Sequence, residues 1–343
     1  MAMLYRCTKH SRDWTANDLA AYHITVVSQN KKEFFGTTNF PDPAKSSLAG
    51  FMATETRTGA ANKKAANRKA ADKKGEDKKT RQLLHYLDLA MDPKIGQEAA
   101  ATNFAVELLK SLDYDDENRI VFIRRTIPFF NYGTNTAAQP DVCIMDDENQ
   151  ILLLLQEDNG LTNVMNMKDP EPQVIAGAIA AFALNNQKRE RDLHLPICDS
   201  IMIPCLTMVD SSPIFYKVTI TAALSKAVQT GTFPAFETRV DRYIPTLPCK
   251  RSDGMRPLPN RLEILRCLEA FKKFIGGVFS GEQGGRKRVA KTERVDVEAR
   301  RNSTPTRKRG RSVTALTQEG DAGADIDNSP RSYRSLRYTK SPL

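Results

Sequence analysis

Asp141 and Glu157 flank a segment whose pattern predicts a β-hairpin. The runs 142–145 and 151–155 are apolar and rich in strand-forming residues, and the polar cluster 146–149 between them predicts the turn. Reversing the chain at this turn places position 141 opposite about position 156 or 157. Two neighbouring carboxylates repel each other unless a cation neutralises them, and their oxygens suit Mg²⁺. The spacing therefore predicts a metal site at the open end of the hairpin, with carboxylates that only solvate the strand ends as the alternative.

The elements around the hairpin follow from the apolar pattern. The run 151–155 does not alternate, which predicts a strand covered on both faces and hence an α/β sandwich. An apolar stripe predicts a helix over 97–112. A second helix is expected over 170–185, where small residues permit close packing on a sheet. A last helix is expected to be capped by Asn260, and further strands are expected over 120–123, 127–130, 200–209 and 214–221.

The charge of the chain is unevenly distributed. At 343 residues the chain has room for one large domain or two small ones, and its net charge is +10. The basic excess lies in 282–343, with 15 Lys or Arg against 8 Asp or Glu, and in 57–81, with 10 against 3. The tail is also poor in aliphatic residues, which predicts disorder. We expect an N-terminal extension that packs on the core (1–56), a basic linker or exposed helix (57–81), a core domain (82–281) and a disordered basic tail (282–343).

The tail contains two short basic runs, 286–288 and 307–311. Such runs are typical of nuclear localisation signals and of contacts with nucleic-acid phosphates. They predict a nuclear protein that binds DNA or RNA through its basic segments. The alternative is a tail that only keeps the chain soluble.

Cysteine usage and hydropathy exclude several classes of protein. The six cysteines contain no Cys-x-x-Cys pair, so no zinc site is expected, and Cys143 and Cys267 should be buried, reduced thiols. The N-terminus has no apolar signal core, and the longest nearly apolar run, 174–184, is too short to cross a bilayer. These features predict an intracellular protein that does not enter the membrane. Nothing in the sequence indicates a protein partner.

The order helix, strand, hairpin, helix, strands resembles the core of the PD-(D/E)XK, or restriction-endonuclease-like, nuclease superfamily. In that superfamily a Pro-Asp precedes an apolar strand and a Glu-x-Lys follows it. Here Pro140-Asp141 and Glu157 match this pattern, and Asn159 stands in place of the lysine. Over residues 12–279 the chain also resembles an uncharacterised family of basidiomycete fungal proteins. The segments that carry this second resemblance are 14–19, 96–100, 139–143, 156–158, 169–173 and 254–258.

The resemblance implies a metal site. Asp141 and Glu157 would bind Mg²⁺, and Glu98, expected early in the first core helix, would complete the site. Glu98 could instead be a surface acid that suits a helix start, and Glu107 is a weaker candidate for its role. Gln173 would open the second helix beside the site, although the Tyr that follows such a Gln four residues later is absent here.

Asn159 decides what activity the resemblance implies. A lysine at this position orients the attacking water and balances developing charge, whereas Asn159 can only form hydrogen bonds. Loss of one such group costs about 10²–10³ in rate in comparable sites. Lys168 could substitute for it, or could be a solvated loop residue. We therefore expect Asp141, Glu157, Asn159 and Gln173 to mark the catalytic site of a degenerate or impaired nuclease. The alternatives are a non-enzymatic nuclear protein that binds nucleic acid or other proteins, and a cytosolic scaffold.

Overall fold

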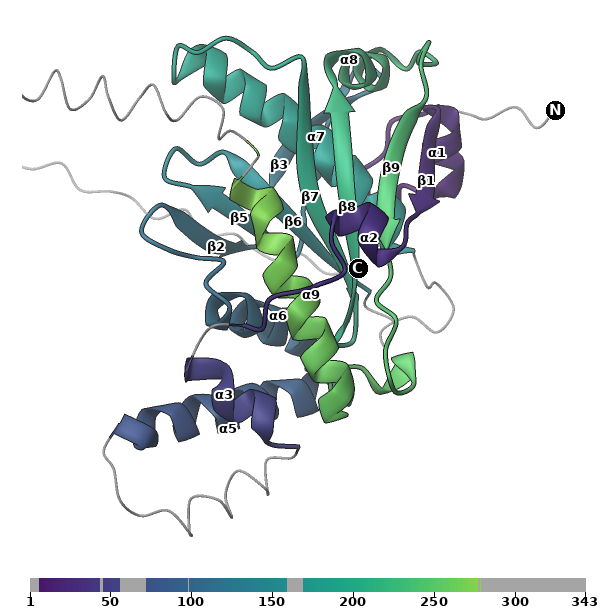
Figure 1. Ribbon diagram of the computed structural model, residues 1–343. Helices are drawn as coiled ribbons and strands as arrows, with labels where there is room; N and C mark the ends of the chain where they lie inside the picture. Colours follow the sequence, from purple (N-terminus) through teal and green to yellow (C-terminus); the bar gives the residue numbers. More distant parts are fainter. Residues whose placement is uncertain are drawn as a thin grey trace, which may run out of the picture. The chain divides into compact units, whose positions relative to one another are not determined.

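The hairpin lies inside a mixed sheet of seven strands (Figure 1). The computed structural model describes residues 6–43, 46–55, 72–97, 99–158, 169–276 and 278, all of which belong to the first of two units, 1–285. The second unit, 286–343, contains the basic runs of the expected tail and lies outside the described residues. The strands are β1 (Ile24–Ser28), β2 (Arg119–Ile123), β5 (Val142–Asp146), β6 (Ile151–Asp158), β7 (Ser200–Val209), β8 (Ser212–Thr221) and β9 (Thr238–Tyr243).

The strand order across the sheet is β1-β9-β8-β7-β6-β5-β2. The pairs β1–β9 and β6–β7 are parallel, and the other four pairs are antiparallel. The β5–β6 hairpin pairs Val142 with Leu155 and Ile144 with Leu153. The hairpin therefore lies between the edge strand β2 and the parallel strand β7.

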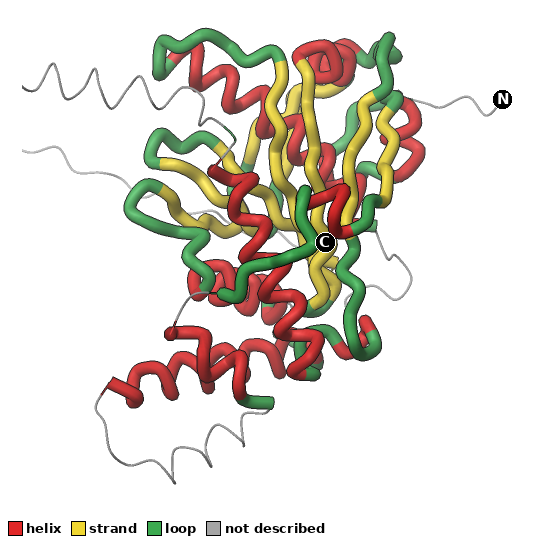
Figure 2. Tube along the Cα trace, in the orientation of Figure 1, coloured by secondary structure: helices red, strands yellow, loops and turns green. Residues whose placement is uncertain are grey.

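Helices cover both faces of the sheet, as the unbroken apolar run of β6 predicts (Figures 1 and 2). One face packs against helices α3 (Ser46–Ala53), α5 (Asp72–Met91), α6 (Ala100–Ser111) and α9 (Leu258–Gly276). The other packs against α7 (Pro170–Arg191). Leu153 and Leu155 of β6 belong to the first core, and Leu154 belongs to the second. The α/β class expected from the sequence is confirmed.

Helix α7 is fixed close to the sheet by its start and by its small residues. The Asp169 side chain caps its first turn by accepting a hydrogen bond from the Glu171 N–H at 3.0 Å, and Pro170 follows the cap. A Cβ on Gly177 would lie 3.3 Å from the Leu154 side chain, which is tighter than most real contacts. The close packing expected from the small residues of this helix is confirmed.

The N-terminal segment contributes directly to the sheet, which the sequence did not predict. Its elements are η1 (Ser11–Asp13), α1 (Ala16–Ala21), β1, α2 (Lys31–Phe35) and α3, and β1 forms one edge of the sheet by pairing with β9. Helix α5 crosses the boundary expected between residues 81 and 82, because Leu83, Leu84 and Leu87 anchor it in the core. Residues 57–71 of the expected basic linker lie outside the described part of the chain.

Several other elements differ from the expectations. The expected strands 120–123 and 127–130 belong to different sheets, because β3 (Ile127–Asn131) pairs only with β4 (Thr134–Ala138) among the described strands. Helix α8 (Ala222–Thr230) and η2 (Arg251–Asp253) were not expected. Asn260 lies within α9 and does not cap it. Its amide instead accepts from the Cys249 N–H at 2.7 Å and donates to the carbonyls of Lys250 and Gly254.

The cysteines are free thiols, as expected. Cys143 and Cys267 are fully buried. Burial raises the pKa of each of these thiols to about 12, against the Arg125 charge near Cys143 and together with the Glu263 charge near Cys267, so neither is a thiolate at neutral pH. Both act as small apolar side chains in the two cores.

Candidate functional site

Asp141 lies directly before β5, and its carboxylate turns toward the end of β6. Its Oδ2 accepts one hydrogen bond from the Gln156 Nε2 at 2.6 Å and another from the Glu157 backbone N–H at 2.8 Å. The Asp141 carbonyl in turn accepts from the Arg124 backbone N–H at 2.9 Å, just beyond the end of β2. The expectation that position 141 faces 156 or 157 across the hairpin is confirmed.

Glu157 extends from β6 toward helix α6. Its side chain shares a face of the strand with Leu155, and the residue is only 3% exposed. One carboxyl oxygen, Oε2, accepts a hydrogen bond from the Thr102 hydroxyl of α6 at 2.8 Å. The other, Oε1, is buried and has no hydrogen-bond partner among the described residues. An unpaired buried oxygen is costly, so this atom needs a proton, a water or a cation.

The electrostatics follow from this burial. Burial and, to a smaller extent, the nearby Asp141 charge raise the pKa of Glu157 to about 8, while the Thr102 hydrogen bond and the Arg124 charge oppose the shift. Burial also raises the pKa of Asp141, against the Glu157 N–H and the Arg124 charge. A Glu with a pKa near 8 is largely protonated at pH 7. The pair therefore carries less negative charge at neutral pH than two ordinary carboxylates.

The positive charge of Arg124 acts on both carboxylates, because it lowers the pKa of Asp141 and the pKa of Glu157. It is exposed, and it follows the last residue of β2 with a left-handed backbone, at φ 51°. This conformation ends the strand and turns the chain toward β3. Arg124 therefore lies at the mouth of the carboxylate pair and stays in contact with solvent.

The donor set fits a hard divalent cation in part. Asp141 and Glu157 offer carboxylate oxygens, which Mg²⁺ prefers, and Glu157 Oε1 has no hydrogen-bond partner among the described residues. The described residues contain no group of three His, Cys, Asp or Glu side chains that could hold a metal. Any third protein ligand would have to come from another part of the chain, and water could complete the shell.

Three residues expected at the site, Glu98, Asn159 and Lys168, lie outside the described residues. Helix α6 begins at Ala100, three residues later than expected, so Glu98 precedes it in the sequence. Glu107 is partly buried in α6, but the α6 side chain that bonds Glu157 is Thr102.

Gln173 lies in the first turn of α7, as expected. Its Nε2 donates to the Asp169 carbonyl at 3.4 Å, within its own helix. Helix α7 packs on the sheet face opposite to the one from which Glu157 extends. Gln173 and Glu157 therefore lie on opposite sides of the sheet, and no hydrogen bond among the described residues joins them.

Two residues that act on the pair, Thr102 and Arg124, were not expected from the sequence, whereas Gln156 occupies one of the two positions expected to lie opposite Asp141. The sequence contained one indication of the Thr102 contact: Thr102 follows Glu98 by four residues, so on the expected helix the two side chains would share a face. Arg124 had no such indication, because its position depends on how β2 pairs with β5.

A second buried carboxylate lies at the closed end of the same hairpin. Asp146 is 9% exposed, and both of its oxygens are bonded: Oδ1 accepts from the Gln150 N–H at 2.7 Å and Oδ2 from the Gln150 amide at 3.2 Å. Burial raises its pKa to about 6, with the Gln150 N–H as the main opposing cause. Asp146 therefore holds the turn of the hairpin and leaves no oxygen for a ligand.

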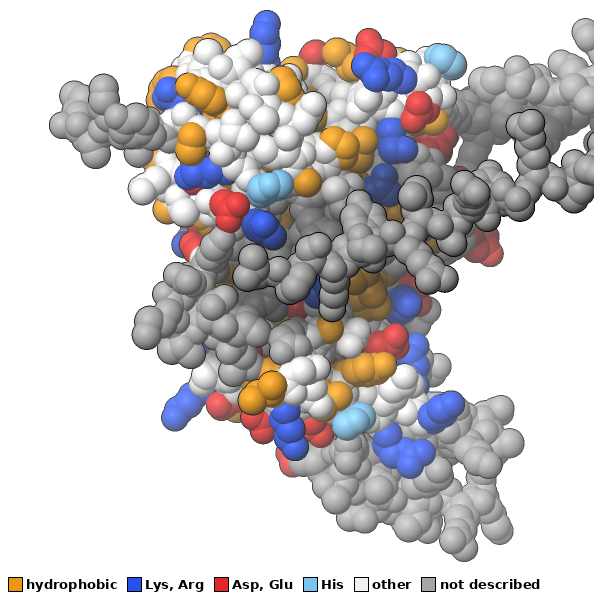
Figure 3. Space-filling model, turned by 180° about the vertical axis from the view of Figure 1, so that it is seen from behind, with side chains coloured by type: hydrophobic (Ala, Val, Ile, Leu, Met, Phe, Trp, Pro, Cys, Tyr) orange, Lys and Arg blue, Asp and Glu red, His pale blue; other side chains and the backbone are white. Residues whose placement is uncertain are grey.

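The sequence matches no protein-family model and no curated protein. Among the described residues, no helix is both long enough and apolar enough to cross a membrane. On the face drawn in Figure 3, the coloured Lys and Arg side chains alternate with Asp and Glu. The described surface on that side thus presents charges of both signs.

Proposed function

We propose that the chain has a PD-(D/E)XK-like core and that Asp141 and Glu157 are the remnant of its metal site. Apart from the separate β3–β4 pair, the order is α6, β2, β5–β6 hairpin, α7, β7. This order supports the proposal, because it is the helix, strand, hairpin, helix, strand order of that superfamily. The pairing of β5 with β6 and the hydrogen bonds from Gln156 and Glu157 to Asp141 support it further. The likeness to basidiomycete fungal proteins belongs to the same proposal.

The observation that carries the proposal is the Glu157 carboxyl group. One of its oxygens is bonded to Thr102, and the other is buried near Asp141 and has no hydrogen-bond partner among the described residues. A structural carboxylate would have both oxygens satisfied, as Asp146 has. An unpaired oxygen next to a second carboxylate is instead the arrangement that a bound Mg²⁺ would stabilise.

A Mg²⁺ ion held by this pair would lower the pKa of water and stabilise charge on a phosphodiester. Asp141, fixed by two hydrogen bonds, and Glu157, fixed by Thr102, would hold it. Asn159 cannot supply the positive charge of the lysine that the superfamily has at this position. We therefore propose an impaired nuclease that acts on or binds nucleic acid.

In this proposal the basic segments 57–81 and 282–343 make the contacts with nucleic acid. Lys and Arg that neutralise phosphates release counterions, so the affinity should fall steeply as salt rises. The basic runs of the second segment would also address the protein to the nucleus.

A second candidate is a nuclear protein that binds nucleic acid or other proteins without cleaving anything. The burial of Glu157 favours it, because an ion must displace a proton from a carboxyl group that is only 3% exposed. In that case the carboxyl pair would be a relic that no longer takes up metal.

Calorimetric titration of the full chain with Mn²⁺ and Mg²⁺ separates the two candidates. We expect the wild type to bind one ion and to release about one proton at pH 7, since Glu157 must ionise. Asp141→Asn and Glu157→Gln should abolish binding. Asp146→Asn is the matched control, because it removes a buried charge from the same hairpin and should leave binding intact. Absence of any binding heat with the wild type at millimolar Mn²⁺ would favour the second candidate.

Nuclease assays and DNA titrations complete the test. With Mn²⁺ and single-stranded or plasmid DNA, we expect weak cleavage or none. Robust cleavage that Asp141→Ala abolishes would show that the enzyme is not impaired. DNA affinity should fall with rising salt and with removal of residues 282–343, and absence of binding by both forms at low salt would contradict a nucleic-acid partner.

A further inference from the structure

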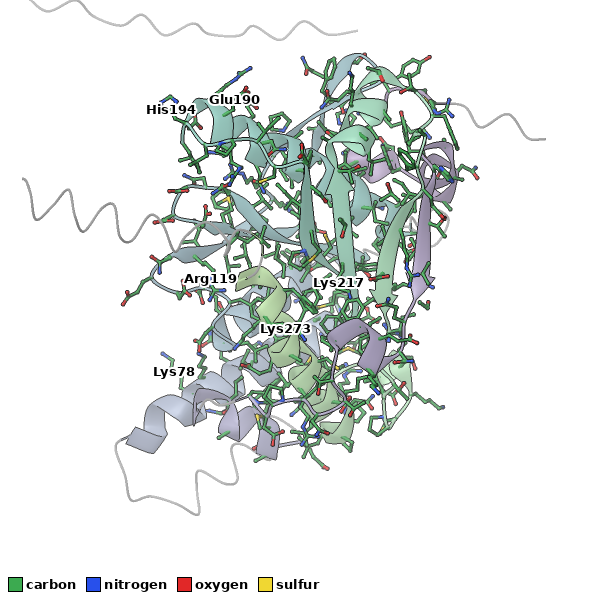
Figure 4. The ribbon with its side chains drawn as sticks, turned by 45° about the horizontal axis from the view of Figure 1, so that its top comes forward. Lys78, Arg119, Glu190, His194, Lys217 and Lys273 are labelled. Atoms are coloured by element: carbon green, nitrogen blue, oxygen red, sulfur yellow. The ribbon has the colours of Figure 1, made fainter. Side chains whose placement is uncertain are left out.

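Strand β2 forms the edge of the sheet opposite β1, and among the described strands it pairs only with β5. Figure 1 shows it at the outer margin of the sheet, and Figure 4 labels Arg119, its first residue. Three of its five side chains are large, apolar and exposed: Ile120 at 50%, Phe122 at 43% and Ile123 at 45%. An exposed apolar edge of this kind is a template for another strand.

The hydrogen bonds of β2 show which backbone groups face outward. The Arg124 N–H donates to the Asp141 carbonyl, and hydrogen-bonded pairs alternate along an antiparallel ladder. The backbone groups of Ile120 and Phe122 therefore point to β5, and those of Arg119, Val121 and Ile123 point to the open edge. Asp116 already bonds both groups of Arg119, at 3.0 and 3.4 Å. The outward N–H and carbonyl groups of Val121 and Ile123 have no partner among the described residues, so they can accept an incoming strand.

This pattern fits a second copy of the same strand. If two β2 strands run antiparallel with Phe122 opposite Phe122, Val121 of each copy lies opposite Ile123 of the other. Both are outward-facing residues, so the two pairs exchange four hydrogen bonds. The Phe122 rings then meet at a non-hydrogen-bonded pair, where side chains come closest and aromatic pairs stabilise a sheet.

The charges around β2 fit the same arrangement. The segment 115–117 before the strand is Asp-Asp-Glu, and Arg124 and Arg125 follow the strand. Asp116, Glu117 and Arg124 are exposed. An antiparallel second copy brings the acidic segment of each chain to the basic end of the other. A parallel copy would instead place like charges side by side, which is unfavourable.

We propose that two copies of this chain associate through β2 and form one continuous sheet across a two-fold axis. The contact uses four main-chain hydrogen bonds, a central pair of phenylalanines and two clusters of opposite charge. It is a small contact, so the dimer should be reversible and concentration-dependent. The proposal does not depend on metal binding or on nuclease activity.

Sedimentation of the full chain over a range of concentrations tests the proposal. Ile123→Pro removes an outward N–H and no bond to β5, and its side chain is exposed, so the sheet should tolerate it. We expect this change to raise the dimer dissociation constant by about tenfold or more, because two symmetry-related hydrogen bonds are lost. Ile123→Val, which keeps the N–H, is the matched control and should remain close to the wild type.

Charge exchange gives a test that does not touch the strand. Glu117→Lys should weaken the dimer, and so should Arg124→Glu, since both side chains are exposed. The double variant should restore much of the affinity, because each copy then offers the reversed charges to the other. Failure of the double variant to recover would contradict the antiparallel contact.

Hydrogen exchange at single residues tests the alternation directly. The Val121 and Ile123 amides should become protected as the concentration rises, whereas the Ile120 and Phe122 amides should be protected at every concentration. A wild-type chain that stays monomeric at high concentration would overturn the proposal. So would a dimer whose affinity Ile123→Pro leaves unchanged, or whose protected amides lie outside β2.

Discussion

The two ends of the β5–β6 hairpin each bury an acidic side chain, but they treat it differently. At the closed end, Gln150 satisfies both oxygens of Asp146. At the open end, Thr102 satisfies one oxygen of Glu157 and the second has no described partner, while Asp141 lies beside it. The first arrangement stabilises a turn. The second leaves a buried carboxyl oxygen of Glu157 without a described partner, which is unfavourable. A bound ligand would stabilise this oxygen, as a binding site requires.

The largest expected effect concerns activity at the open end. If Asn159 is what limits cleavage, Asn159→Lys should raise the Mn²⁺-dependent rate by about 10²–10³, because it restores a charge that balances the developing negative charge. The measurement is cleavage of single-stranded and plasmid DNA under single-turnover conditions. The combination of Asn159→Lys with Asp141→Ala should lose the gain. A gain that survives this combination would mean that the cleavage does not come from the carboxylate pair.

The pH dependence of stability should differ between the two ends. The folded-state pKa of Glu157 is raised to about 8 from 4.5, so its stabilising effect is complete below pH 4.5 and is lost as the pH rises toward 8. At the steepest point, this group removes about 1.4 kcal/mol of unfolding free energy per pH unit. Glu157→Gln should flatten the wild-type curve in this window. Urea unfolding at a series of pH values measures it.

Asp146 should also lower the unfolding free energy as the pH rises, but over a different pH range. Its folded-state pKa is raised to about 6 from 3.8, so Asp146→Asn should alter the curve mainly between pH 4 and 6. Saturating Mg²⁺ should abolish the loss that Glu157 causes and leave the loss from Asp146 unchanged, because only the first group would hold the ion. Equal effects of Mg²⁺ in the two windows would contradict the contrast between the ends.

The smallest effect concerns the hydroxyl that positions Glu157. Thr102→Val keeps the volume but removes the donor to Oε2, so neither oxygen of the Glu157 carboxyl then has a described partner. We expect a loss of about 1–3 kcal/mol in unfolding free energy at neutral pH. Thr80→Val is the control, since the buried Thr80 hydroxyl has no partner among the described residues and its removal should cost little. Equal losses in both variants would show that the effect is general packing.

Much of the fold around the site could be predicted from the sequence, because local patterns specify it. The apolar runs of β5 and β6 predicted the hairpin. The Asp169-Pro170 start and the small residues that follow it predicted α7. Strands with weak patterns escaped prediction. β4 reads Thr-Asn-Thr-Ala-Ala, and β9 contains only two large apolar residues, Val240 and Tyr243. These segments become strands through their neighbours rather than through their own composition.

The residues of the candidate site also divide into those that the local sequence predicts and those that it does not. Asp141 and Glu157 could be paired approximately from the sequence, because both belong to one hairpin, although an irregularity between Ile144 and Met145 shifts the register. Thr102 and Arg124 could not, because they reach the pair from α6 and from the end of β2. Such contacts depend on how distant elements pack. The burial of Glu157 Oε1, which has no partner within the described part of the chain, could not be predicted either, since burial is a property of the assembled layers.

The pairing of β1 with β9 has a consequence for how the chain is made. Ile24 lies opposite Thr238, so the parallel edge cannot close until nearly all of the core has left the ribosome. Pairings between such distant segments are slow, because the intervening chain must first be ordered. Until then, β1 must remain unpaired while the strands from β2 to β8 emerge. During synthesis the N-terminal strand is therefore the segment most in need of protection, by a chaperone or by its own short length.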